Sequence, residues 1–161
     1  MNKTTAGHDA ESGDFNFVEG EWEVHQRYVP SRALVEFFGG LKRKEILGSP
    51  VEGTGRIIVP PQDFCELSYR PTGPLVPVGP GGTIRSFTIV HSRFANGPPP
   101  PVTMVFVQFD GADTASPGYL QGTALQPGTE LELIGARCRA VFVDAPQGDW
   151  RDFWFELETE V

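Results

Sequence analysis

A chain of 161 residues has the size of about one domain. It can bury roughly 68–70% of its unfolded surface, so an unaided core is expected. The 13 basic and 21 acidic residues give a net charge of −8, which disfavours a nucleic-acid partner because such binding depends on Lys and Arg contacts to phosphate. The 19 Gly, 15 Pro and 12 Phe residues are typical of short strands joined by tight turns.

Targeting and membrane signals are not evident. The first ten residues lack the apolar stretch of a signal peptide, and no apolar run approaches the ~20 residues of a membrane span. We therefore expect a cytoplasmic protein without membrane contact. The two cysteines, Cys65 and Cys138, are too few for a disulfide framework, and we expect both to be buried, reduced thiols.

The N-terminal part is expected to be a disordered tail over residues 1–14, followed by an arm and a helix over residues 15–45. The arm alternates apolar and polar residues, which is typical of an extended segment lying on a partner or on the body of the protein. Because aromatic residues commonly dominate interface energetics, the arm is predicted to contact a partner through Phe15, Phe17, Trp22 and Tyr28.

A helix is predicted to begin after Ser31, a good N-cap residue. The spacing of its apolar residues indicates one continuous face, and the Gly39–Gly40 pair is expected to weaken its end. The basic run Lys42–Lys44 suits a helix C-terminus, and it could instead meet a phosphate. The apolar face contains Leu34, Phe37, Phe38 and Leu41, of which Phe37 and Phe38 are predicted partner contacts.

Residues 46–72 have the spacing of a rubredoxin-like zinc ribbon without its ligands. Such a ribbon carries Cys-x-x-Cys in each of two turns, because four thiolates close a tetrahedral site. The chain keeps one thiol at these positions, so we expect a degenerate ribbon held by packing, with zinc unlikely as a cofactor. Its strands are predicted at 55–59 and 64–69. The four ligand positions are Val51, Thr54, Cys65 and Ser68.

A Pro/Gly segment over residues 70–82 is predicted to be a stiff connector. Beyond it, residues 73–161 show only strand patterns, and Gly135 is expected to mark a bulge or sharp bend in the longest of them. Five strands in about 80 residues predict a closed OB-type barrel, with a β-sandwich as the alternative. The fold class is therefore mainly β, and the barrel strands are predicted at 84–91, 102–109, 119–123, 129–143 and 151–158.

Strict alternation in the first barrel strand predicts two faces. Arg85, Phe87, Ile89 and His91 are expected to share one of them. The last strand ends in a row of glutamates, which is best interpreted as a solvated sheet edge.

The order of these segments resembles the zinc-ribbon plus OB-fold family of acyl-CoA-associated proteins, over roughly residues 15–158. The Gly-Thr-x-x-Ser-Phe-Thr run and the Pro-Pro turn of the ribbon are the most specific features. The matching segments are ILG at 46–48, GRIIVPP at 55–61, FCELSY at 64–69, GGTIRSFTIVH at 81–91, GARCRAVF at 135–142 and RDFWFE at 151–156.

The resemblance implies a non-catalytic accessory subunit in a hetero-oligomer. Such a subunit docks on a thiolase-like enzyme and helps to form a site for a CoA thioester, without supplying the nucleophile. An acyl-CoA aldolase or a hydratase is the alternative partner. The chain departs from the family at three of the four zinc positions, so metal binding is not carried over. A Pro run at 98–101 also lengthens the first barrel hairpin, and this loop is expected to help choose the partner.

Catalytic residues are not predicted in this chain. Nucleophilic catalysis needs Ser or Cys beside a base, and the three histidines His8, His25 and His91 are not placed with one. The acidic neighbours of Cys65 are expected to oppose thiolate formation. Two further alternatives are a single-stranded nucleic-acid binder, with Arg85, Arg137 and Arg139 lining the groove, and a small hydrolase. The predicted acyl-CoA contacts are Phe64, Phe87, His91, Arg93, Lys42 and Lys44.

Overall fold

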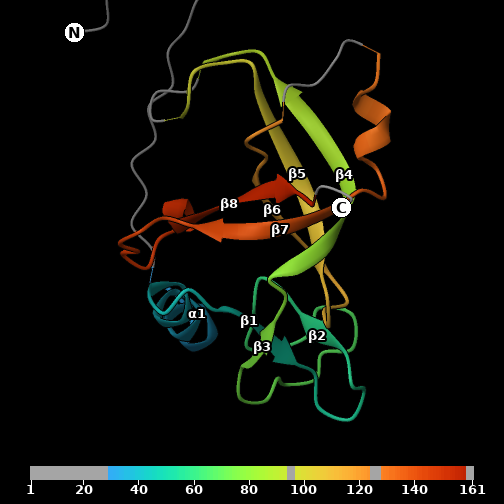
Figure 1. The fold of residues 1–161 in the computed structure, drawn as a ribbon. Helices are drawn as coiled ribbons and strands as arrows, with labels where there is room; N and C mark the ends of the chain where they lie inside the picture. Colours follow the sequence, from blue (N-terminus) through green and yellow to red (C-terminus); the bar gives the residue numbers. More distant parts are fainter. Residues whose placement is uncertain (1–28, 94–96, 124–127, 159–161) are drawn as a thin grey trace, which may run out of the picture.

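The computed structural model describes residues 29–93, 97–123 and 128–158, which form one α-helix, two short 3-10 helices and two antiparallel sheets (Figure 1). The predicted tail and arm over residues 1–28 lie outside the described residues. The elements are α1 (Arg32–Lys42), β1 (Ile46–Pro50), β2 (Ile57–Ile58), β3 (Val76–Val78), β4 (Gly81–Val90), β5 (Val102–Phe109), β6 (Ala115–Tyr119), η1 (Glu130–Leu133), β7 (Arg137–Phe142), η2 (Trp150–Asp152) and β8 (Phe153–Leu157).

Helix α1 begins as predicted, with the Ser31 side chain accepting a hydrogen bond from the Leu34 backbone N–H at 3.2 Å. Its glycine pair does not end it, because the helix continues to Lys42. Gly40 is a packing residue: a Cβ there would lie 2.7 Å from Leu47 Cδ1. The absence of a side chain at this position therefore lets β1 approach the helix closely.

The smaller sheet has the order β2-β1-β3, and it differs from the predicted ribbon in two ways. Residues 64–69 form a turn instead of a strand, because Cys65 N–H and Tyr69 N–H bond locally to Arg70 O and Cys65 O. β2 pairs with β1, which was not predicted, and β1 pairs on its other side with β3, which lies within the expected connector. Pro77 within β3 hides its strand pattern in the sequence.

The larger sheet has the order β6-β5-β4-β7-β8 and closes on itself. A parallel bridge joins Leu120 to Phe155, and Gln121 N–H donates to Phe155 O at 2.8 Å. Closure of five strands gives the predicted OB-type barrel, seen above the small sheet in Figure 1. The barrel pairs strands that are distant in sequence, so the closing contact could not be predicted from local pattern.

Strand β4 contains a bulge between Ile84 and Ser86, where its pairing with β5 shifts register. The extra residue, Arg85, is exposed, so the buried face continues from Ile84 to Phe87. The prediction that Arg85 and Phe87 share a face is therefore wrong, because strict alternation fails across a bulge.

Two other barrel strands differ from their predicted ranges, one in position and one in length. The strand predicted at 119–123 is β6, and Pro117 and Gly118 within it conceal the pattern. The long strand predicted at 129–143 is divided into η1 and β7, and the division lies at Gly135, whose φ of 88° is left-handed. The bend expected at Gly135 is thus confirmed.

The two sheets are joined by the turn that follows β5. Asp113 accepts a hydrogen bond from Ile57 N–H at 2.8 Å and donates its own N–H to Ile57 O. The Thr114 hydroxyl likewise accepts a hydrogen bond from Val59 N–H at 2.7 Å and donates one to Val59 O at 2.8 Å. One apolar core then runs through α1, the small sheet and the barrel, so the units are packed as a single body.

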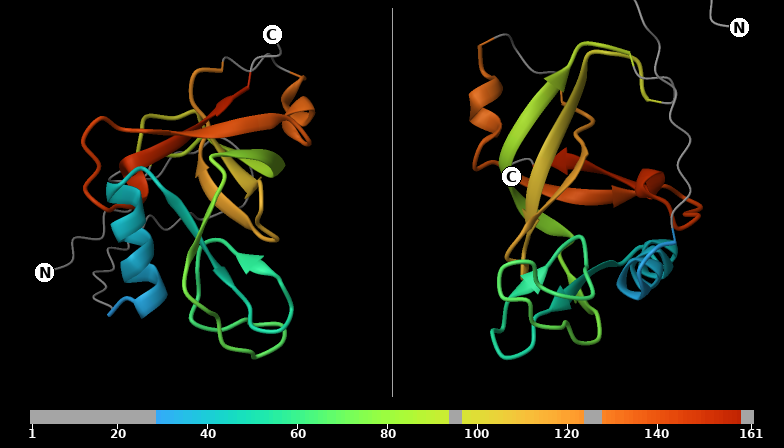
Figure 2. Two further views of the ribbon diagram at one scale, coloured as in Figure 1. Left: turned by 60° about the horizontal axis from the view of Figure 1, so that its bottom comes forward. Right: turned by 180° about the vertical axis from the view of Figure 1, so that it is seen from behind.

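The views in Figure 2 show α1 beside the small sheet. The loop between β7 and β8, which contains η2, lies against α1. In the described ranges, no helix is long and apolar enough to cross a membrane.

Candidate interaction surface

Two hydrogen-bonded turns define the end of the small sheet. In the first, Val51 O accepts from Thr54 N–H at 3.3 Å and from Thr54 Oγ1 at 3.2 Å. In the second, Cys65 O accepts from Tyr69 N–H at 2.7 Å. Val51 and Cys65 are each only 2% exposed, and with Ile58 they form a small buried cluster separate from the main core.

The second turn presents large apolar side chains to solvent. Phe64 is 54% exposed, Leu67 68% and Tyr69 83%. Tyr69 has a φ of 55°, a left-handed conformation that costs a non-glycine residue energy. We call these three residues the turn patch. Several large exposed apolar side chains within one short segment are typical of a protein contact surface.

A groove of about 270 Å³ lies next to the turn patch. It is formed between the start of α1 and the segment that follows the second turn. Asp63 connects the two walls, because its carboxylate accepts a hydrogen bond from Ala33 N–H at 3.0 Å. The groove is lined by Arg32, Ala33, Glu36, Asp63, Thr72, Gly73 and Leu75.

The structure does not bring the predicted acyl-CoA contacts together. Phe64 lies on the second turn of the small-sheet region, whereas His91 and Arg93 are exposed just beyond the end of β4. In Figure 1 the small sheet and the end of β4 lie at opposite ends of the molecule. Phe87 is partly buried and packs against the barrel core. A third location holds Lys42 and Lys44, both exposed at the end of α1.

The residues predicted to contact a partner are not gathered on one surface either. Phe37 is fully buried in the core, so its prediction as a contact residue is wrong. Phe38 is half-buried, and its ring packs edge-on against Trp150 with centroids 5.4 Å apart. The periodicity of α1 identified its apolar face correctly, but that face serves the core because η2 and β1 cover it. The remaining contacts, Phe15, Phe17, Trp22 and Tyr28, lie outside the described residues.

Sequence reasoning missed Leu67 and Tyr69. The alternation of FCELSY suggested a strand, which would have buried one of its faces. A usable signal is present, since Pro71, Thr72 and Gly73 follow directly and favour a turn. Large apolar residues inside a turn are unusual, and that combination indicates a contact surface.

The residues at the four ribbon positions do not fit a metal ion. Zinc in a structural site takes four Cys or His ligands, and these positions supply one thiol, two hydroxyls and the apolar Val51. Within the described part of the chain, no three His, Cys, Asp or Glu side chains are grouped so as to hold a metal.

The environment of Cys65 differs from the expectation. A hydrogen bond from the Ser68 side chain is the main cause that lowers the pKa of Cys65, and the Ser68 and Leu67 backbone N–H groups and the charge of Arg56 act in the same direction. The acidic neighbours in the sequence are therefore not the groups that face the sulfur. Both cysteines are buried and free, as predicted.

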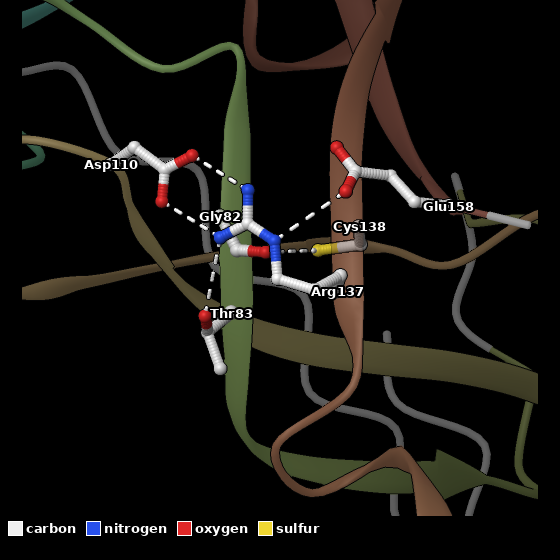
Figure 3. A network of polar contacts seen from close by, with 6 residues as sticks. All are labelled: Gly82, Thr83, Asp110, Arg137, Cys138 and Glu158. Carbon is white, nitrogen blue, oxygen red and sulfur yellow. Dashed lines mark hydrogen bonds and ion pairs between the residues drawn. The ribbon is translucent and has the colours of Figure 1, made fainter. Parts of the chain in front are cut away.

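A polar network lies on the barrel surface, where β4, β5 and β7 meet (Figure 3). Arg137 donates two parallel hydrogen bonds to the Asp110 carboxylate, each 2.7 Å long, and lies 3.4 Å from a Glu158 oxygen. These bonds lower the pKa of Asp110 and raise that of Arg137. Beneath the network, burial raises the pKa of the Cys138 thiol to about 12. The network therefore ties strands together and contains no activated nucleophile.

We expect the Arg137→Met variant to raise the pKa of Asp110 towards its ordinary value, because the guanidinium is the main group that stabilises its charged form. An NMR titration of the Asp110 carboxyl carbon measures this directly. Arg139→Met, on the same strand but outside the network, is the matched control and should leave the titration unchanged. An unaltered Asp110 titration in Arg137→Met would show that the ion pair does not persist in solution.

Comparison with known proteins gives one family match. Residues 75–143 match the model of the family described as ChsH2, C-terminal OB-fold domain, which covers β3 to β7. No curated protein matches the chain by sequence. The predicted OB-fold is thereby confirmed for this part of the chain.

Solved structures of similar fold include two of the DUF35 type. A DUF35-family protein of unknown function from Sulfolobus solfataricus is 22% identical, with a TM-score of 0.58 over 79% of this chain and 86% of that chain. The Ltp2-ChsH2(DUF35) aldolase contains a chain that is 17% identical, with a TM-score of 0.59 over 81% of this chain and 97% of that chain. At these identities the likeness shows a common fold.

Proposed function

We propose that this protein is a non-catalytic accessory subunit that docks on an acyl-CoA enzyme and helps to form its acyl-CoA site. The observation that carries the proposal is the likeness to the chain in the Ltp2-ChsH2(DUF35) aldolase, which extends over 97% of that chain. The family match to the ChsH2 OB-fold domain supports it independently. A thiolase-like enzyme is the partner we favour from the sequence resemblance, and an aldolase or a hydratase is the alternative.

The described residues suit a binding role better than a catalytic one. Arg137 is engaged by Asp110 and Glu158 in an ion-pair network on the barrel surface. The turn patch, in contrast, offers two aromatic rings and a leucine that are exposed among the residues that the structure describes. Interfaces are enriched in such aromatic residues, and a few of them carry most of the binding energy.

A CoA thioester at a shared site is part of this proposal. Lys42 and Lys44 are the candidates for its phosphates, because both are exposed and an ammonium group forms charge-assisted hydrogen bonds with phosphate. Phe64, on the turn patch, lies at a different location and would contact the partner there. His91 and Arg93 lie at the other end of β4 and would meet a different part of the assembly.

Co-purification tests the proposal. An affinity-tagged chain expressed in its native host should retain a larger subunit that mass spectrometry identifies as an acyl-CoA enzyme. The triple variant Phe64→Ala, Leu67→Ala, Tyr69→Ala should weaken its retention by ~10-fold or more, because exposed aromatic anchors are lost while the core is untouched. The variant should keep the circular dichroism spectrum of the native chain.

The matched control removes an exposed apolar pair elsewhere. Leu131 is 74% exposed and Ile134 53% exposed, and both belong to the η1 region on the barrel. Leu131→Ala, Ile134→Ala should bind the partner normally. A native chain that purifies alone, and that changes the activity of no acyl-CoA enzyme from its host, would rule out the proposed function.

No described feature favours the nucleic-acid alternative. Of the three arginines on which it rests, Arg137 is paired with two carboxylates and Arg85 donates to Gln108 at 2.8 Å.

A further inference from the structure

The two turns of the small sheet are built around the same four positions, and each position has a defined partner. The first residue of each turn, Val51 or Cys65, points inward and packs with Ile58. The fourth residue of each turn, Thr54 or Ser68, carries a hydroxyl that bonds back to its own turn. The Thr54 hydroxyl donates to Val51 O and accepts from Arg56 N–H at 3.2 Å. The Ser68 hydroxyl bonds to the Cys65 sulfur.

Backbone hydrogen bonds close each turn, and further backbone contacts connect the first turn to the segment after the second. Val51 N–H donates to Arg56 O at 2.7 Å, and Cys65 N–H donates to Arg70 O at 2.8 Å. Val51 forms a bridge with Thr72, and Glu52 N–H donates to Pro71 O at 3.1 Å. These contacts connect the first turn to the segment that leaves the second, so the arrangement does not depend on a ligand between them.

We infer that the paired turns form a metal-independent knuckle in which the buried positions Val51 and Cys65 and the exposed positions Thr54 and Ser68 still surround one centre. Apolar packing of Val51, Ile58 and Cys65, together with the two hydroxyl contacts, takes the place of four thiolate ligands. Metal-dependent ribbons lose their fold when the ion is removed, because binding energy and folding energy are the same quantity. This knuckle should keep its fold under the same treatment, and the turn patch that it supports should keep its shape.

The first arm of the experiment uses the native full-length chain. Elemental analysis of the purified protein should find well below one zinc per chain, and a strong chelator should leave the melting temperature unchanged. Stoichiometric zinc, with a melting temperature that falls on chelation, would overturn the inference.

The second arm tests the geometry of the four positions. The variant Val51→Cys, Thr54→Cys, Ser68→Cys restores four thiols, and it should bind one Co²⁺ per chain with the thiolate-to-metal charge-transfer absorption of a tetrahedral site. Adding Cys65→Ser to this variant is the matched control and should abolish that absorption. A folded four-thiol variant with no cobalt absorption would show that the positions do not converge. If that variant does not fold, the zinc content and melting temperature of the native chain decide whether the knuckle is metal-independent.

Discussion

Replacement of Phe155 by alanine is expected to lower the free energy of unfolding by about 3–5 kcal/mol, the usual cost of removing a buried phenylalanine ring. Phe155 is fully buried, and its ring lies 5.6 Å from those of both Phe109 and Phe153. Its backbone also receives the hydrogen bond from Gln121 that closes the barrel. The cavity would therefore form beside the contact that joins the first and last parts of the barrel sheet.

Thermal and urea unfolding measure this effect. For a chain of this size, a loss of that magnitude corresponds to a fall in melting temperature of about 10 °C. Phe106→Ala is the matched control, because Phe106 lies on β5 of the same barrel but is 40% exposed. It should cost about 1 kcal/mol or less. Equal losses in the two variants would contradict the barrel closure described here.

Asp152 is the second residue at which a large loss is expected. Its side chain is nearly buried and accepts hydrogen bonds from three consecutive backbone N–H groups, those of Gln147, Gly148 and Asp149, at 2.9, 2.6 and 2.9 Å. Asp152→Ala leaves these donors without a partner. Because hydrogen bonds to charged groups contribute about 1.5–3 kcal/mol each and the donors partly reach water, we expect a net loss of about 3 kcal/mol.

The pH dependence of this contribution follows from the Asp152 pKa. Desolvation raises it, but the three backbone hydrogen bonds outweigh that effect and hold the pKa below its ordinary value of 3.8. A carboxyl whose pKa is lower in the folded state stabilises the protein above its unfolded pKa, and it loses this contribution as the pH falls through the folded value. The stability difference between native protein and Asp152→Asn should therefore shrink as the pH falls below 3.8.

Urea unfolding at a series of pH values tests this expectation. Asp144→Asn, an exposed substitution in the same loop, is the matched control. The difference in the free energy of unfolding between Asp144→Asn and the native protein should not shrink with falling pH as it does for Asp152→Asn. A difference for Asp152→Asn that stays constant down to acidic pH would contradict the assigned role of the carboxylate.

The loop that Asp152 organises has a consequence for α1. It places Trp150 against Phe37 and Phe38, with ring centroids 5.2 and 5.4 Å apart. Gly148 lies so close to the helix that a Cβ there would be 2.9 Å from Phe38 O. The helix is therefore held to the barrel by this loop as well as to the small sheet by β1.

Much of the barrel could be predicted from the sequence because its strands are long and alternate clearly. β5 begins and ends at the predicted residues, and Cys138 on β7 is buried as expected. The start of α1 was equally predictable, because Ser31 caps it through a local contact. These features depend on periods of two or 3.6 residues and on neighbours within one turn.

The small sheet and the contact surface could not be predicted in the same way. β2 and β3 are only two and three residues long, too short for a period to be visible, and both pair with β1 across the sheet. The bulge at Arg85 changes the face on which each later residue of β4 lies relative to Ile84. One extra residue moves every following side chain to the opposite face of the sheet from the one that strict alternation predicts.

By itself, the sequence determined an OB-type barrel, a capped helix and two unpaired thiols, and it predicted a ribbon with three of its four ligand positions lacking sulfur. The tertiary structure decided which apolar residues are core and which are surface. Phe37 and Phe64 are both phenylalanines in apolar patterns, yet one is fully buried and the other is 54% exposed. The physical reason is that burial depends on which distant segment covers a side chain, and here η2 and β1 cover the helix while nothing described covers the turn.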